Sequence, residues 1–114
     1  MSLSEFEHQR IEKLFGVYCE GKIPAHVRNK IRITFKISGN EVILFEYRPR
    51  FDDPALWCEM AIARFKKNEK KNVWHLYCAD RNSKWHLYEP YPEHKDIEKL
   101  LGEVQRDKTG IFWG

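Results

Sequence analysis

The chain has 114 residues and a formal net charge of +3, with 20 Lys and Arg against 17 Asp and Glu. Hydrophobic residues make up 42% of it and aromatic residues 14%, and no apolar run approaches the roughly 20 residues that cross a bilayer. These numbers predict a soluble globular chain and exclude a membrane-spanning helix. The sequence pI of about 8.8 falls short of the value above ~9 that is typical of nucleic-acid-binding domains, so the charge permits an anionic partner without requiring one.

The cysteines and the first residues of the chain indicate a reducing compartment. The three cysteines form no Cys-x-x-Cys pair, and the start Met-Ser-Leu-Ser lacks the basic and apolar regions of a secretory signal. We therefore expect a cytoplasmic protein with reduced thiols. Small thiols are common in protein cores, so Cys19, Cys58 and Cys78 are predicted to pack against apolar neighbours rather than to react or bind a metal.

The first half of the chain predicts a helix followed by a hairpin. Ser4 and Glu7 form a capping box, and apolar residues continue at helical spacing until Gly21. From residue 31 apolar and polar residues alternate, which is typical of a half-buried strand, and Gly39 with Asn40 gives a two-residue hairpin turn. One face of this hairpin is apolar, and the opposite face mixes bases with aromatics, namely Arg32, Lys36, Phe45 and Tyr47.

A third strand is predicted from Trp57 to Lys67, and its pattern leaves open which side chains face the core. The next two strands form a hairpin, because the tetrad Trp-His-Leu-Tyr occurs at 74–77 and again at 85–88 around the polar residues 80–83. With Arg81 and Asn82 at its tip, Cys78 faces Trp85 and Leu76 faces Leu87. Paired residues share a sheet face, so this register gives an apolar layer of Trp74, Leu76, Cys78, Trp85 and Leu87, and an amphipathic layer of His75, Tyr77, His86 and Tyr88.

The last quarter of the chain predicts a second helix and an apolar end. Pro92 suits the first turn of a helix whose apolar stripe runs from Ile97 to Val104. The residues 111–113, Ile-Phe-Trp, are expected to dock on the body of the protein, and insertion into a partner's groove is the alternative. The sequence therefore predicts a single α+β domain over residues 1–114: an antiparallel meander of about five strands flanked by an N-terminal and a C-terminal helix, both on one sheet face.

Motifs for metal, cofactor and catalytic chemistry are absent from the sequence. The five histidines include no His-x-x-x-His pair, and no glycine-rich phosphate loop or Gly-x-Ser-x-Gly elbow occurs. We therefore predict no metal, no cofactor and no catalytic residue. His75 and His86, expected on one hairpin face, could share a transition metal, but packing against tyrosine is the favoured interpretation.

A basic and aromatic surface is the positive candidate for function. Single-stranded nucleic acid is held by bases that stack on exposed aromatics and by cations that follow the phosphates. We hypothesise a non-catalytic binding module whose arginines and lysine contact an anionic partner such as nucleic acid, while a histidine and two tyrosines stack or donate hydrogen bonds. The binding residues are Arg48, Arg50, Arg64, Arg81, Lys84, Tyr47, His86 and Tyr88. In the competing interpretation, Phe45 and Tyr47 lie beneath a helix as core.

Two other classes of function stay open. One is a protein-interaction or assembly module that uses a sheet edge or the apolar C-terminal tail, with an oligomeric state that the sequence does not give. The other is a small enzyme, in which Asp80, Arg81 and His86 meet Glu46 at one sheet edge. For that cluster, a turn aspartate and ordinary surface charge are the favoured interpretation.

Several short motifs spread over nearly the whole chain carry a resemblance to a known family. They are Pro24-Ala-His26-Val-Arg28, Phe45-Glu46-Tyr47-Arg48-Pro49, Ile62-Ala63-Arg64-Phe65, the two Trp-His-Leu-Tyr tetrads with Asp80-Arg81-Asn82, and the final Thr109-Gly110-Ile111-Phe112-Trp113-Gly114. Read together, they resemble a family of small bacterial proteins catalogued as domain of unknown function 3024. The resemblance implies a bacterial, single-domain protein and brings no known activity, cofactor or catalytic residue with it.

Overall fold

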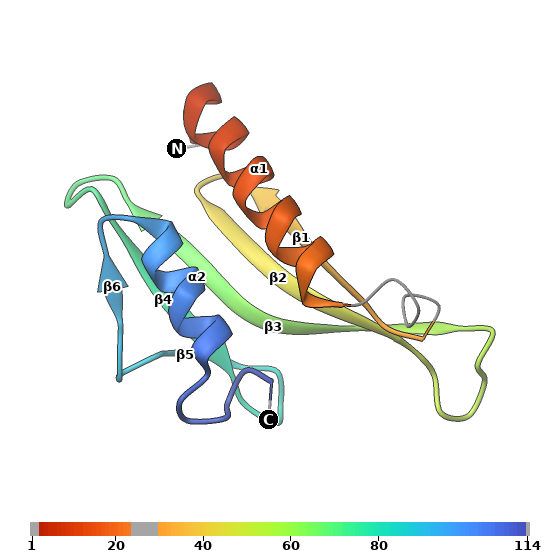
Figure 1. Ribbon diagram of the computed structural model, residues 1–114. Helices are drawn as coiled ribbons and strands as arrows, with labels where there is room; N and C mark the ends of the chain where they lie inside the picture. Colours follow the sequence, from red (N-terminus) through yellow and green to blue (C-terminus); the bar gives the residue numbers. More distant parts are fainter. Residues whose placement is uncertain (1–2, 24–29, 114) are drawn as a thin grey trace.

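The fold is an antiparallel sheet packed against two helices, α1 (Glu5–Lys22) and α2 (Ile97–Arg106) (Figure 1). The computed structural model describes residues 3–23 and 30–113, so the motif at 24–28 lies outside the described residues. The strands follow the chain in meander order and are β1 (Arg32–Ser38), β2 (Glu41–Pro49), β3 (Trp57–Asn68), β4 (Val73–Ala79) and β5 (Trp85–Leu87). A short sixth strand, β6 (Glu93–His94), pairs with β4 beside β5. The predicted α+β class and the meander are confirmed.

Helix α1 begins at the predicted capping box. The Ser4 hydroxyl oxygen accepts the backbone N–H of Glu7 at 3.2 Å, which satisfies one of the free donors of the first turn. Along the helix, Phe15 is fully buried, and its ring centroid lies 5.5 Å from that of Phe35 and 5.2 Å from that of Phe65. These aromatic contacts fasten α1 to the sheet.

A bulge explains why the facing of the third strand could not be read from its pattern. Leu44 pairs with Ala63, but the next residue, Phe45, pairs with Ala61, so Ile62 is an extra residue on β3. The bulge interrupts the alternation, and both Ile62 and Ala63 are buried. Beyond the bulge, β2 and β3 continue past their neighbours. We call residues 48–62, which extend to the right in Figure 1, the arm.

The predicted register of the β4–β5 hairpin is wrong by one residue. The structure pairs Tyr77 with Leu87 and Ala79 with Trp85, so Trp85 and Leu87 leave the expected apolar layer. The reason is the turn, in which Ser83 has a φ of 62° and forms a three-residue loop with the two residues before it. The Asp80 carboxylate fixes this loop by accepting the backbone N–H groups of Asn82 at 2.8 Å and Lys84 at 3.0 Å.

The second helix begins later than predicted. Residues around Pro92 pair with β4 instead of starting a helix, since the carbonyl oxygen of Pro92 accepts the Leu76 N–H at 2.9 Å. The helix starts after Asp96, whose carboxylate accepts the N–H of Glu98 at 3.0 Å. Its predicted apolar stripe is confirmed, because Ile97, Leu100, Leu101 and Val104 are all buried.

The apolar end of the described chain is docked, as predicted. Phe112 is buried, with its ring centroid 4.9 Å from that of Tyr88. The carboxylate of Asp107, which caps α2 in a left-handed conformation, accepts the N–H of Phe112 at 3.0 Å and that of Trp113 at 2.7 Å. These bonds hold Phe112 and Trp113 against the body, while the side chain of Ile111 is 46% exposed.

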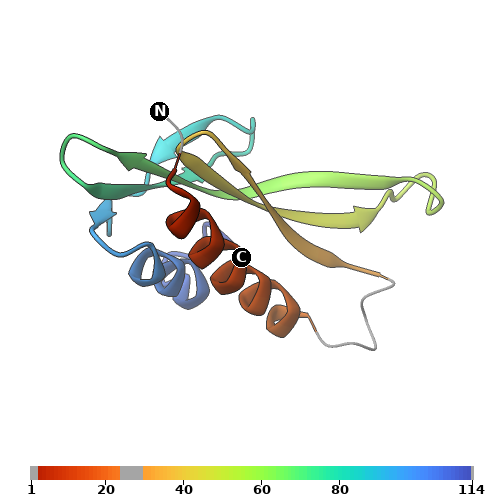
Figure 2. The same cartoon turned by 90° about the horizontal axis from the view of Figure 1, so that it is seen from above.

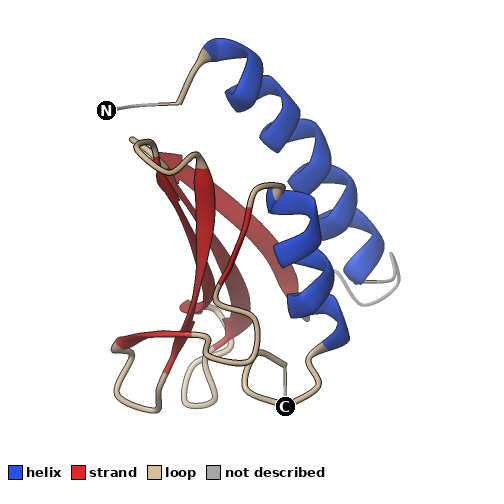
Figure 3. Cartoon of the chain, turned by 90° about the vertical axis from the view of Figure 1, so that its left-hand side faces the viewer, coloured by secondary structure: helices blue, strands red, loops and turns tan. Residues whose placement is uncertain are grey.

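Both helices cover the same face of the sheet. Seen from above and from the side, α1 and α2 lie together on one side of all the strands, and no described helix lies on the other side (Figures 2 and 3). The expected placement of the helices is confirmed. Neither described helix is long and apolar enough to cross a membrane. We call the opposite side of the sheet the uncovered face.

Candidate functional site

The uncovered face has a defined set of side chains, because strand pairing fixes which residues point to it. The register and the alternation along β1 to β5 assign it Arg32, Thr34, Lys36, Glu41, Ile43, Phe45, Tyr47, Trp57, Glu59, Arg64, Lys66, His75, Tyr77, Trp85 and Leu87. Most of its aromatic rings are half-buried by their neighbours on the sheet rather than by a helix. Phe45 and Tyr47 are therefore surface residues, and their interpretation as core beneath a helix is wrong.

Cations lie over the aromatic rings of this face. The Arg32 guanidinium carbon is 5.3 Å from the centroid of the Trp57 ring, and the Lys36 ammonium nitrogen is 4.8 Å from that of Phe45. On the neighbouring strands, Arg64 lies over Tyr77 at 5.4 Å. All of these distances fall within the ~6 Å range of favourable cation–π contact. Basic and aromatic groups thus alternate across β1 to β4.

Two carboxylates neutralise part of this positive charge. Glu41 accepts hydrogen bonds from Arg64 through Nε at 2.9 Å and through Nη2 at 2.6 Å. Glu59 accepts from the Tyr47 hydroxyl and from the Lys36 ammonium group at 3.1 Å. These hydrogen bonds, that of Tyr47 first, hold the pKa of Glu59 below its usual value, so Glu59 is ionised at neutral pH.

One end of the uncovered face is mainly basic. A hollow of about 400 Å³ at the β3–β4 turn is lined by Lys66, Lys67, Lys70, His75 and Tyr77, together with Asn40, Asn68 and Glu69. Lys67 belongs to the helix side, where it pairs with Glu7. The remaining lysines, Lys66 and Lys70, line the same hollow as Tyr77.

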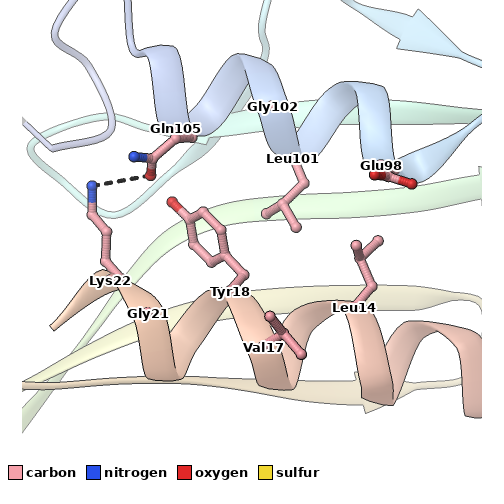
Figure 4. Close-up of a pocket in the computed structure, with 9 residues that line it drawn as sticks. All are labelled: Leu14, Val17, Tyr18, Gly21, Lys22, Glu98, Leu101, Gly102 and Gln105. Atoms are coloured by element: carbon pink, nitrogen blue, oxygen red, sulfur yellow. Dashed lines mark hydrogen bonds between the residues drawn. The ribbon is translucent and has the colours of Figure 1, made fainter.

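A groove between the two helices forms another hollow. Its volume is about 440 Å³, and Figure 4 shows Leu14 and Tyr18 of α1 pointing toward α2, which contributes Leu101 and Gln105. Burial raises the pKa of Tyr18 to about 12, so its hydroxyl stays protonated. The groove is largely apolar and offers no cluster of groups that could catalyse a reaction.

The model of the family described as Domain of unknown function (DUF3024) matches residues 3–114. The chain therefore belongs to the DUF3024 family. No curated protein matches the chain, and no solved structure does. The family description assigns no activity, so the chemistry of this DUF3024 chain has to be derived from its own side chains.

Seven of the eight predicted binding residues are spread over three parts of the DUF3024 fold. Only Arg64 and Tyr47 lie on the uncovered face. Arg48 and Arg50 are on the arm, where Arg48 pairs with Glu46 and Arg50 with Asp52. Arg81, Lys84 and His86 gather at the β4–β5 turn, where His86 Nε2 lies 2.7 Å from a carboxylate oxygen of Asp80. The structure therefore does not bring the eight residues together.

Three sequence-based placements are wrong for identifiable reasons. Tyr88 is 2% exposed and packs on Phe112, so it has no free ring for stacking. The one-residue change of register turns His86 to the side opposite His75, which separates the two histidines that were expected on one face. Glu46 is buried on β2, and β3 and β4 lie between it and the Asp80–His86 pair.

Some residues of the uncovered face could not be identified from the sequence. Trp57 could not be assigned to a face because of the bulge, and lysines in a polar turn such as residues 66–72 are usually simple solvent contacts. One signal in the sequence was available. Lys66 is two residues from Arg64, and His75 is two residues from Tyr77, and residues two apart on a strand point to the same face of the sheet. Among the described residues, no group of three His, Cys, Asp or Glu side chains could hold a metal ion.

Proposed function

We propose that the uncovered face binds single-stranded nucleic acid without catalysing a reaction. The main support for this proposal is a row of cation–aromatic pairs on a sheet face that no described helix covers. The pairs are Arg32 with Trp57, Lys36 with Phe45, and Arg64 with Tyr77. Stacking of a base on such a ring contributes about 1–3 kcal/mol and tolerates any base, because every base has a flat π face. A flat platform of this kind suits single strands.

The cations give the proposed face its affinity for phosphates. Lys66 and Lys70 lie at one end, and Arg64 and Lys36 lie between the rings. In the free protein, Glu41 and Glu59 hold Arg64 and Lys36 in place. A bound strand would exchange these carboxylates for phosphates, so binding should weaken steeply with salt. The resemblance described above and the reduced thiols lead us to propose a bacterial, cytoplasmic setting.

The proposal is tested with matched lysine variants. Lys36→Ala removes a cation of the uncovered face, and Lys13→Ala removes an exposed lysine of α1 on the other side of the molecule. We expect Lys36→Ala to weaken binding to a labelled single-stranded RNA or DNA oligonucleotide and to reduce the salt slope by about one, while Lys13→Ala leaves both unchanged. Equal affinities for both variants and the parent chain would count against the proposal.

A further inference from the structure

One edge of the arm lacks a neighbouring strand. Strand β4 pairs with β3 only over residues 63–68. Within residues 3–23 and 30–113, no other strand pairs with that edge over residues 57–62, and Figure 1 shows β3 continuing well past the end of β4. The edge therefore presents backbone N–H and C=O groups to solvent.

Apart from the bulge at Ile62, this edge lacks the devices that prevent sheet edges from pairing with another chain. Natural edge strands carry lysine, proline or inward-pointing charge, and residues 57–62 read Trp-Cys-Glu-Met-Ala-Ile. Their single charge, Glu59, is neutralised within its own sheet by Lys36. Exposed apolar side chains accompany the edge along the arm, namely Phe51, Leu56, Trp57 and Met60.

We propose that a second copy of the chain pairs with this edge, antiparallel, to form a dimer with a twofold axis perpendicular to the sheet. Such an axis brings one edge against itself, so each exposed backbone group meets a complementary group of the other copy. The partner strand runs in the direction of β4 and in line with it. In this arrangement the β2–β3 connection of each copy lies next to the β4–β5 turn of the other copy.

The charges at those two sites are complementary, which favours a second copy over another partner. In the β2–β3 connection Asp52 pairs with Arg50, whereas Asp53 has no ion pair in the described part of the chain, so the connection is negative by one charge. The β4–β5 turn carries Arg81 and Lys84, both exposed, which pair with no carboxylate of the described residues. The twofold axis produces this contact twice, and it joins the two uncovered faces into one continuous surface.

Analytical ultracentrifugation of the full chain under reducing conditions tests the interface. We expect a monomer–dimer equilibrium for the parent chain. Met60→Lys should weaken it at least about tenfold, because it places a lysine on the edge. Val17→Lys is the matched control, since Val17 is 67% exposed on α1 and Met60 is 60% exposed on the arm. A parent chain that stays monomeric at millimolar concentration, or a dimer that Val17→Lys weakens and Met60→Lys does not, would overturn the proposal.

Charge reversal tests the orientation of the two copies. The pair Arg81→Glu and Lys84→Glu, and separately the pair Asp52→Lys and Asp53→Lys, should each weaken the dimer. Combining all four substitutions should restore it, because the ion pairs re-form with opposite sign. No restoration would contradict the antiparallel contact. These readouts need no nucleic acid, so they stand or fall independently of the proposed binding function.

Discussion

The guanidinium of Arg64 lies 5.4 Å from the centre of the Tyr77 ring, on adjacent strands of the uncovered face. Glu41 holds the same guanidinium from the side through two hydrogen bonds. The carboxylate therefore competes with any phosphate that approaches this ring. Removal of the Glu41 charge is therefore expected to strengthen the binding of single-stranded nucleic acid.

Glu41→Gln should increase the affinity for single-stranded RNA at low salt by roughly two- to fivefold, the effect expected for one partly exposed ion pair. Glu98→Gln is the control, because it makes the same change of net charge on α2, behind the sheet. Both affinities are measured by fluorescence anisotropy of a labelled oligonucleotide. An equal gain for both variants would mean that net charge alone is responsible.

The Asp107 carboxylate should stabilise the docked C-terminal segment. It accepts the backbone N–H groups of Phe112 and Trp113, and hydrogen bonds to a charged group contribute about 1.5–3 kcal/mol each. We predict that Asp107→Ala, which removes both bonds, lowers the free energy of unfolding in urea by about 3 kcal/mol or more. Asp107→Asn, which tolerates the left-handed conformation and keeps one acceptor, should lower it less. An Asp107→Ala variant that is as stable as the parent chain would contradict this role of the carboxylate.

The Asp96–Arg10 pair should make stability depend on pH in the acid range. The two side chains lie 2.9 Å apart, and the hydrogen bond from Arg10 is the main cause that lowers the pKa of Asp96. A carboxylate with a lower pKa in the folded state stabilises the fold above its unfolded pKa of ~3.9, and this contribution is lost as pH falls through the folded pKa.

We therefore predict that the free energy of unfolding decreases from about pH 5 to pH 2, and that Asp96→Asn shows a decrease smaller by about 0.2–1 kcal/mol. Asparagine still caps the helix, so the comparison isolates the charge. Arg10→Ala should flatten the curve in the same way. Curves that run parallel for the parent chain and Asp96→Asn would refute the assignment.

The three thiols should differ sharply in reactivity. Cys58 lies exposed on the arm, which contradicts its predicted burial, whereas burial raises the pKa of Cys19 to about 11 and also raises that of Cys78. At pH 8 we predict one fast-reacting thiol per folded chain with a disulfide reagent and three in urea. Cys58→Ser should remove the fast phase, and its persistence in that variant would show that a buried thiol is accessible.

Local signals were sufficient to predict most of the fold. Ser4 with Glu7 marked the start of α1, and the turn at Gly39, with a φ of 58°, was visible in the sequence. The β4–β5 register was not predictable, because it depends on whether the Asp80 carboxylate closes a loop of two or of three residues. Pro92 is compatible with a helix start as well as with a strand end, and only its contact with Leu76 on β4 decides between them.

The candidate site was harder to predict than the fold. Periodicity places Phe45 and Lys36 on one face of a hairpin, but it cannot tell whether a helix distant in the sequence covers that face. The packing of Phe15 against Phe35 and Phe65 settles this, since it draws α1 to the other side. Trp57 could not be placed because the bulge at Ile62 breaks the alternation between it and the core.

The most direct test compares a single strand with a duplex of the same sequence, at low and at near-physiological salt, through the fluorescence of the native tryptophans. Trp57 and Trp85 lie on the uncovered face and should report stacking. We predict quenching by the single strand that weakens steeply with salt, and much weaker binding of the duplex, whose bases are already stacked. No response to either, or equal binding of both, would contradict a stacking platform on this face.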